Sequence, residues 1–359
     1  MFESNSKARR VRRIPVLTAL LMVVCLAPID GYAQEVPARV LAIGDSHSGY
    51  ESLDARLAAF PPPGPESEGA KTPNRVFHGP DGAPLPFQTV SEVEEFLRTA
   101  NVVDVQLIGE GVTKPKRILL EAGGVQARAK FGYHDFKGQG EKLADGSTEM
   151  YFQDSFKADM AAYVLSRLLG MEMVPPAVTR QVESQDGIVQ IWIEDLTSYE
   201  SWIQDGNSGQ PASLYFQRQV KDMKTFDLLI RNIDRHSRNI NWDNDWNLWL
   251  IDHTRSLAKD ATLRKEDSFK GCSRGLFQAI RGLSKSDLEA ALGPYLGGFE
   301  IKALLKRRDK LVKMIEGQIK KQGEDKILFN YGDAPPGLVI SYDETAELAP
   351  RGAAAKSAG

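Results

Sequence analysis

Two short segments near the middle of the chain carry the residue types that phosphoryl transfer requires. The first is Asn232-Ile-Asp234-Arg-His-Ser-Arg-Asn239, and the second is Leu250-Ile-Asp252-His-Thr. One carboxylate can orient an attacking hydroxyl and take its proton, while an asparagine and a second aspartate can hold the Mg²⁺ ions that bridge nucleotide phosphates. The residue types therefore predict a phosphotransferase centre built from Asp234, Asn239 and Asp252.

The spacing of these residues agrees with that chemistry. Asp234 and Asn239 are separated as the two functional residues are in the HRDxxxxN catalytic loop. Between Asn239 and Asp252 lies one tight-turn signal, Asp243-Asn-Asp245. We read it as a hairpin turn, because it lacks the ligand spacing of an EF-hand loop. Such a hairpin would return Asp252 to the side of Asn239.

Phosphoryl transfer also uses a lysine that pairs with phosphate oxygens and an acid on a nearby helix that positions the lysine. Lys130 lies on the strand expected to carry that lysine, and Asp159 lies in the helix expected to carry its partner. Glu149 is a second candidate for the partner of Lys130, and the sequence leaves the choice open.

Taken together, these segments resemble the atypical kinases. DRHxxN followed by an aspartate at a strand end is similar to the phosphatidylinositol kinases, the bacterial persistence-toxin kinases and the secretory-pathway casein and xylosyl kinases. The segments 161–180 and 226–236 are similar to the secretory-pathway group. The resemblance covers roughly residues 100–310. It implies an α+β, two-lobed protein-kinase-like fold, with a small antiparallel sheet lobe and a helical lobe.

The resemblance also implies roles for individual residues. Asp234 would be the catalytic base, Asn239 and Asp252 the metal ligands, and Lys130 the phosphate lysine. ATP and Mg²⁺ (or Mn²⁺) would be the cofactors. The residues expected to bind the nucleotide are Gly109 and Gly111 of a glycine loop, Lys130, Asp159, and Trp192 and Glu194 of the adenine-side hinge strand 191–194.

Four features need separate mention. Asp159 stands where glutamate is usual, His-Thr follows Asp252 in place of Phe-Gly or Asn-Gly, and the glycine loop is short. His236 has two interpretations, a side chain that braces the catalytic loop or a second base. These departures bear on catalytic competence more than on the fold.

The elements that must position these residues follow from hydrophobic periodicity and turn signals. A helix with Ser91 three residues before Glu94 fits a capping box. After the third strand we expect a polar loop at 132–153, then a helix capped by Asp154 or Ser155 that ends at Gly170. The expected strands are 102–107, 116–120, 125–131, 177–182 and 188–193, and later helices are expected at 284–292 and 299–320.

The expected domain organisation has five parts. They are a signal peptide at 1–33, a strand–helix segment with a Pro/Gly-rich linker at 34–87, a nucleotide-binding N-lobe at 88–196, a C-lobe with the catalytic loop and metal ligands at 197–325, and a disordered tail at 326–359.

The N-terminus has the pattern of a secretory signal peptide. Basic residues at 7–13 precede an apolar run at 14–26, and Gly31-Tyr-Ala33 supplies small residues at the positions that signal peptidase recognises. The run is short for a membrane span. We therefore expect an exported protein, periplasmic or secreted, cleaved after Ala33 and without a stable membrane span. The remaining cysteine, Cys272, then has no partner for an intramolecular disulfide.

A second motif, Gly44-Asp45-Ser-His47, resembles the first metal-binding motif of calcineurin-like metallophosphoesterases. Such a site also needs an Asn-His pair and two further histidines, and the other four histidines show no such pattern. We interpret the segment as a remnant strand. A hydrolase centred on Asp45 and His47 is kept as a third hypothesis.

Composition narrows the partners. The 359 residues are 42% hydrophobic and 26% charged with a formal net charge of -3, which gives no sign of nucleic-acid binding. The expected partners are a nucleotide and a hydroxyl-bearing acceptor: an exported protein, a glycan or a small molecule. A secreted pseudokinase, which binds a nucleotide or a partner without turnover, is the alternative, because a bacterial periplasm would contain little ATP.

Overall fold

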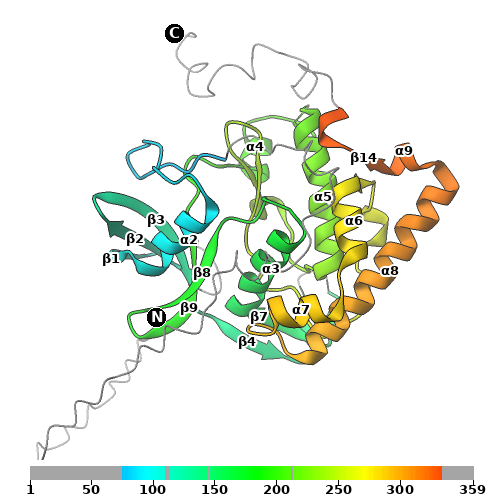
Figure 1. Cartoon of the computed structure of the whole chain (residues 1–359), viewed down its shortest axis with the longest axis horizontal. Coiled ribbons are helices and arrows are strands. Elements are labelled where there is room, and N and C mark those ends of the chain that lie inside the picture. Colours follow the sequence, from blue (N-terminus) through cyan, green and yellow to red (C-terminus); the bar gives the residue numbers. More distant parts are fainter. Residues whose placement is uncertain (1–74, 110–113, 144–145, 212, 334–359) are drawn as a thin grey trace, which may run out of the picture. The chain divides into compact units, whose positions relative to one another are not determined.

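A five-stranded antiparallel sheet forms the first lobe, in the strand order β1-β2-β3-β9-β8 (Figure 1). The computed structural model describes residues 75–109, 114–143, 146–211 and 213–333, all of which belong to the unit Glu51–Gly359. The strands of the sheet are β1 (Asn101–Leu107), β2 (Lys116–Ala122), β3 (Val125–Gly132), β8 (Ala177–Val182) and β9 (Gln185–Ile191).

Helix α2 (Val90–Thr99) covers this sheet and closes its core. The helix is capped by Thr89 with Glu92, not by Ser91 with Glu94 as expected. Both pairs fit the same sequence pattern, but the Glu94 side chain is buried and accepts a hydrogen bond from Tyr163 Oη at 2.5 Å. The carboxylate that sequence assigns to the cap is therefore used in packing.

Helix α3 (Phe156–Leu168) lies between the sheet and the helical lobe, where it contacts β8 and β9 on one side and α7 on the other (Figure 1). Its N-cap is Ser155, whose hydroxyl accepts the Lys157 N–H. Ten of its residues are buried, because the helix packs on two sides. Side chains in its first turn therefore lie at the junction of the lobes.

The region expected as a polar loop between β3 and α3 contains two short antiparallel strand pairs, one enclosed by the other along the chain. In the first, β4 (Asp135–Gly138) pairs with β7 (Phe152–Ser155); in the second, β5 (Glu141–Lys142) pairs with β6 (Thr148–Glu149). Strands this short and polar lack the alternation that marks a strand in sequence.

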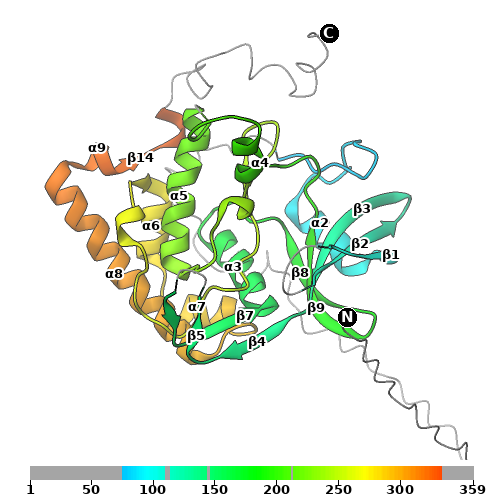
Figure 2. The same cartoon turned by 180° about the vertical axis from the view of Figure 1, so that it is seen from behind.

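The second lobe is mainly helical and surrounds one large core (Figure 2). Its helices are α4 (Tyr199–Gln204), α5 (Leu214–Ile230), α6 (Arg274–Gly282), α7 (Lys285–Leu292), α8 (Gly298–Gln322) and α9 (Glu324–Ile327). Among the described residues, no helix is both long and apolar enough to cross a bilayer.

Two small sheets complete this lobe. The expected hairpin is formed by β11 (Ile240–Trp242) and β12 (Leu248–Leu250), and β10 (Thr197–Ser198) pairs along β11. Strand β13 (Cys272–Ser273) runs parallel to β14 (Leu328–Phe329), and a final 3₁₀ turn reaches Asp333. Ordered elements thus continue past residue 326, where we had expected a disordered tail to begin.

Asp222 ties β13 and the final 3₁₀ turn to α5. It is buried, and its carboxylate accepts the Ser273 N–H at 2.7 Å and the Tyr331 hydroxyl at 2.9 Å. Burial raises the pKa of Asp222 to about 6, although the hydrogen bonds from Ser273 and Tyr331 oppose the shift. The protonated form is therefore favoured by folding.

We predict that Asp222 makes the protein less stable as the pH rises from about 4 to about 6. A pKa raised in the folded state contributes stability that is complete below the unfolded value and lost through the folded value. Asp222→Asn, which does not titrate, should lose this part of the pH dependence, measured by urea unfolding at several pH values. The exposed Asp186→Asn is the control. An unchanged pH dependence in Asp222→Asn would refute the assignment.

Candidate active site

Lys130 projects from β3 toward the first turn of α3. Its Nζ lies 3.0 Å from Oδ2 of Asp159, whose side chain is fully buried. Burial acts against both charges, yet the Lys130 ammonium holds the pKa of Asp159 well below its usual range. The pKa of Lys130 is raised, because the carboxylates of Asp159, Asp252 and Asp154 outweigh its burial. The structure thus places Asp252 close enough to Lys130 to act on its charge.

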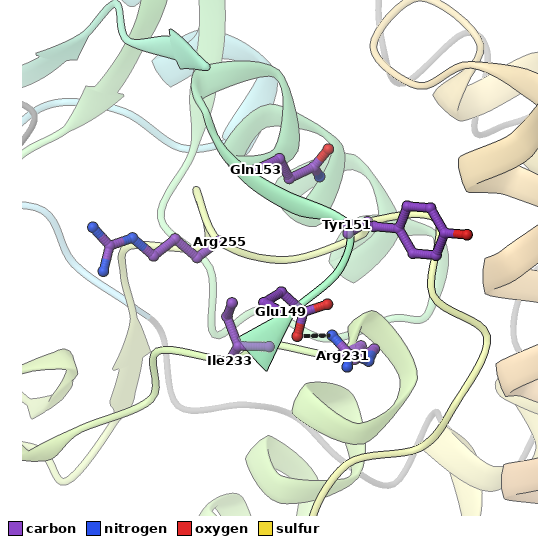
Figure 3. A pocket seen from close by; sticks show the side chains of 7 residues that line it. Glu149, Tyr151, Gln153, Arg231, Ile233 and Arg255 are labelled. Atoms are coloured by element: carbon purple, nitrogen blue, oxygen red, sulfur yellow. Dashed lines mark ion pairs between the residues drawn. The ribbon is translucent and has the colours of Figure 1, made fainter. Parts of the chain in front are cut away.

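Glu149, the other acid considered for Lys130, lies elsewhere. Its Oε2 pairs with Arg231 Nη1 at 2.8 Å, beside a small cavity that Tyr151, Gln153 and Arg255 also line (Figure 3). Arg231 ends α5 in the left-handed conformation with φ of 53°. Glu149 therefore stabilises the end of α5, and Asp159 is the partner of Lys130.

Arg235 holds the segment 234–239, the predicted catalytic loop, to α5 and to the chain after β12. Its guanidinium makes a two-pronged ion pair with Asp227 of α5, Nε to Oδ2 at 2.9 Å and Nη2 to Oδ1 at 3.0 Å. Nη1 donates to the carbonyl oxygens of Asn239 and Ile251. One side chain thus fixes the position of Asn239 relative to the chain that leads into Asp252.

His253 connects the Lys130–Asp159 pair to Arg235. Its side chain is fully buried, with Nδ1 at 3.3 Å from Asp159 Oδ1 and Nε2 at 3.0 Å from Arg235 Nη2. A guanidinium can only donate, so Nε2 accepts and Nδ1 carries the proton that faces Asp159. The His253 N–H also donates to Asp159 Oδ1 at 3.1 Å. A continuous polar chain therefore links β3, α3, the catalytic loop and α5.

Asp234 is partly exposed, at 33% of its side chain, and its Oδ2 lies 3.2 Å from Arg255 Nη1. Burial raises the pKa of Asp234, and the nearby Asp252 carboxylate reinforces the shift while Arg255 opposes it. A carboxylate with a raised pKa holds a proton more firmly and is a better general base.

Asn239 lies buried beneath Asp234. Its Nδ2 donates to the Asp234 carbonyl oxygen at 3.0 Å and lies 3.2 Å from His236 Nε2. These contacts use the amide nitrogen, which leaves Oδ1 as the atom able to bind a cation. The neutral His236 ring has one accepting nitrogen, so it accepts either the Arg238 N–H on Nδ1 at 3.3 Å or the Asn239 amide on Nε2. Both contacts of His236 lie within the loop, which favours the bracing role over that of a second base.

Asp252 follows β12 with φ of 61°, a left-handed conformation that costs a non-glycine residue about 1–3 kcal/mol. Its Oδ1 accepts the Thr254 hydroxyl at 3.2 Å. In the described part of the chain, no three histidine, cysteine, aspartate or glutamate side chains form a metal site. The expected pair, one aspartate and one asparagine, suits Mg²⁺, which usually takes few protein ligands and completes its shell with phosphate oxygens and water.

The hinge segment 191–194 is not a continuous strand as predicted. Strand β9 ends at Ile191, so the residues after it continue without ladder pairing, although the Trp192 N–H donates to the Arg128 carbonyl oxygen at 2.9 Å. Glu194 pairs with Arg128 at 2.9 Å, and burial raises its pKa. Gly109 follows β1, and an added Cβ there would meet no atom within 4 Å.

Other predicted residues cannot be placed. Gly111 of the glycine loop, Asp45, His47 and the predicted signal peptide lie outside the described residues. Three residues at the site were not predicted as site residues: Asp154, which was expected only as a possible helix cap, His253 and Arg255. A signal existed for His253, since it is one of the departures from the usual motif.

Comparisons with known proteins support the fold. No family model and no curated protein matches the chain. It is similar to the solved structure of a Golgi casein kinase, at 15% identity and a TM-score of 0.51 over 68% of this chain and 78% of that one. It is also similar to hydra Fam20 solved with sugar, at 14% identity and a TM-score of 0.51 over 68% of this chain and 93% of that one. The predicted α+β kinase-like fold is thereby confirmed.

We predict that His253→Phe, which restores the aromatic residue of the Phe-Gly motif, destabilises the protein. Phenylalanine cannot replace either side-chain hydrogen bond, so Arg235 Nη2 keeps only its contact with Asp227, and Asp159 loses the imidazole as a partner. The free energy of unfolding should fall by about 2–5 kcal/mol, as expected when one member of a buried polar network is removed. Urea unfolding measures the change, with the exposed His78→Phe as control. Equal midpoints for His253→Phe and the parent would contradict the prediction.

Proposed function

We propose that this chain is an atypical kinase that transfers a phosphoryl group from ATP, with Mg²⁺ or Mn²⁺, to a hydroxyl of an exported acceptor. One observation carries the proposal: Lys130 with Asp159, and Asp234 with Asp252, act on one another's charges within a kinase-like fold. Asp252 acts on the charge of both Lys130 and Asp234, which supports assigning the phosphate lysine, the base and a metal carboxylate to one site.

Each residue has a defined task under this proposal. Lys130, held by Asp159, pairs with phosphate oxygens, and Asn239 Oδ1 and the Asp252 carboxylate hold the cation. The cation, when bound, neutralises charge on the nucleotide phosphates. Asp234 orients the acceptor hydroxyl and accepts its proton. The hinge residues Trp192 and Glu194, and the glycine loop of Gly109 and Gly111, belong to the nucleotide side of the site.

The usual objection to an aspartate in the first turn of α3 does not hold here. Asp159 is shorter than glutamate, yet its carboxylate reaches Lys130 at 3.0 Å. The acceptor stays open among a protein, a glycan and a small molecule. One neighbouring structure is a casein kinase and the other was solved with sugar. A protein and a glycan are therefore the acceptors to test first.

A secreted pseudokinase is the second candidate. The observation that favours it is the ion pair of Asp234 with Arg255, which places a cation against the proposed base. The two candidates differ in turnover and share nucleotide binding, so both quantities have to be measured.

We predict different losses from the metal ligand and the base. Asp252→Asn should abolish metal-dependent nucleotide binding, because the phosphate charge then lacks its bridging cation. Asp234→Asn should retain binding and lose turnover by about 10² or more, the usual contribution of a positioned general base. Titration of ATP with Mg²⁺ and with Mn²⁺, with phosphotransfer followed in parallel, makes the comparison. Exposed Asp245→Asn, in the turn between β11 and β12, is the control.

The outcomes separate the candidates. Binding without turnover in the parent, on any acceptor including the protein itself, selects the pseudokinase. If the parent binds no nucleotide, both the kinase and the pseudokinase proposals are refuted, and only the kinase-like fold remains. Activity that survives in Asp234→Asn at the parent's level would show that another residue is the base.

Export is also proposed. The basic residues at 7–13, the apolar run at 14–26 and Ala33 support cleavage at that site. We predict that N-terminal sequencing of the secreted protein begins at Gln34. An intact N-terminus on a protein that stays in the cytosol would refute export and, with it, the expected exported acceptor.

A further inference from the structure

We propose that Arg255, anchored by Asp154, is a positioning residue that sets the orientation of the Asp234 carboxylate toward the acceptor hydroxyl. The inference rests on the proposed function, since it concerns how the base of that reaction is held. Neither residue was identified from the sequence motif.

The first step is the contact of Arg255 with the base. Arg255 Nη1 lies 3.2 Å from Asp234 Oδ2. Across residues 75–333, leaving out the segments that the structure does not describe, the Asp234 carboxylate has no other hydrogen-bond donor. A carboxylate held through Oδ2 presents its second oxygen, Oδ1, for the acceptor hydroxyl.

The second step is the anchor of Arg255. Its Nε lies 2.9 Å from Oδ2 of Asp154, a β7 residue that is 4% exposed. Its Cζ also lies 5.5 Å from the centre of the Phe152 ring. Because Nε and Nη1 belong to one rigid plane, fixing Nε on a buried carboxylate limits where Nη1 can lie. Asp154 therefore acts on Asp234 through Arg255.

The third step is the backbone that carries Arg255. The Ile233 N–H donates to the Arg255 carbonyl oxygen at 3.2 Å, and the Ser155 N–H donates to the Thr254 carbonyl oxygen at 3.0 Å. The Gln153 side chain donates to the Ser256 carbonyl oxygen. The segment is thus bound to the catalytic loop on one side and to β7 on the other. Its geometry fits a support and not a mobile surface arginine.

The charge around Asp234 fits the same role. The groups that act on its carboxylate are Arg255, Asp252, His236 and Asp154. Asp252 and Asp154 are acids, so without Arg255 their charge would repel the Asp234 carboxylate toward solvent. The Arg255 guanidinium offsets this repulsion and keeps the Asp234 side chain within the site.

The experiment compares Arg255→Met, Arg255→Lys and Asp154→Asn with the parent. Arg255→Met should lower kcat by about 10², the scale of a misplaced catalytic group, with nucleotide KM and Kd unchanged. Arg255→Lys should recover part of the loss, because an ammonium keeps the charge but lacks the rigid planar fork that fixes one contact relative to the other. Asp154→Asn should show a smaller loss in kcat than Arg255→Met. Exposed Arg281→Met on α6 is the control and should behave as the parent.

Two results in active protein would overturn the proposal. The first is an Arg255→Met variant with the parent's kcat. The second is an Arg255→Met variant whose nucleotide affinity falls in step with kcat, since that shows general damage to the site.

If the parent has no turnover, the proposed function fails and the contact is tested by stability. Urea midpoints are then measured for Arg255→Met, Asp234→Asn and the double variant. Arg255 holds Asp234 if the double variant loses less than the sum of the single losses. Strictly additive losses overturn the proposal.

Discussion

The buried carboxylate of Asp159 is the group on which the arrangement of the site depends. It is fully buried and has partners on both oxygens: Lys130 on Oδ2, and the backbone and imidazole of His253 on Oδ1. A buried charge without partners costs several kcal/mol, so these contacts cannot be given up singly. Because Lys130 comes from the sheet and His253 follows Asp252, satisfying Asp159 also positions Lys130 relative to Asp252.

The chain of contacts continues beyond Asp159. His253 accepts from Arg235, and Arg235 is paired with Asp227 of α5. The residue after Asp252 is a polar link, so the sheet, α3 and the segment 232–239 are connected by directional bonds as well as by packing. Directional bonds tolerate less displacement than apolar contacts, which favours one geometry of the site.

Much of this could be predicted from local spacing. The interval from Asp234 to Asn239, the turn before Asp252 and the alternation around Lys130 each lie within one or two elements, and the structure has those elements. The contacts that sequence missed join distant residues: His253 with Asp159 is separated by 94 residues, and Arg255 with Asp154 by 101. Pattern and propensity carry no information about such pairs, because they arise only when the lobes pack together.

The aspartate in α3 reaches Lys130 at 3.0 Å although its side chain is one methylene shorter than that of glutamate. The α3 residues Ala158, Ala161 and Ala162 are almost completely buried, and small side chains allow close packing against neighbouring elements. Ala161 and Ala162 belong to one core with Ala177 and Ile188 of the sheet. Enlarging either alanine would therefore disturb the packing of α3 on the sheet, which keeps Asp159 close to Lys130.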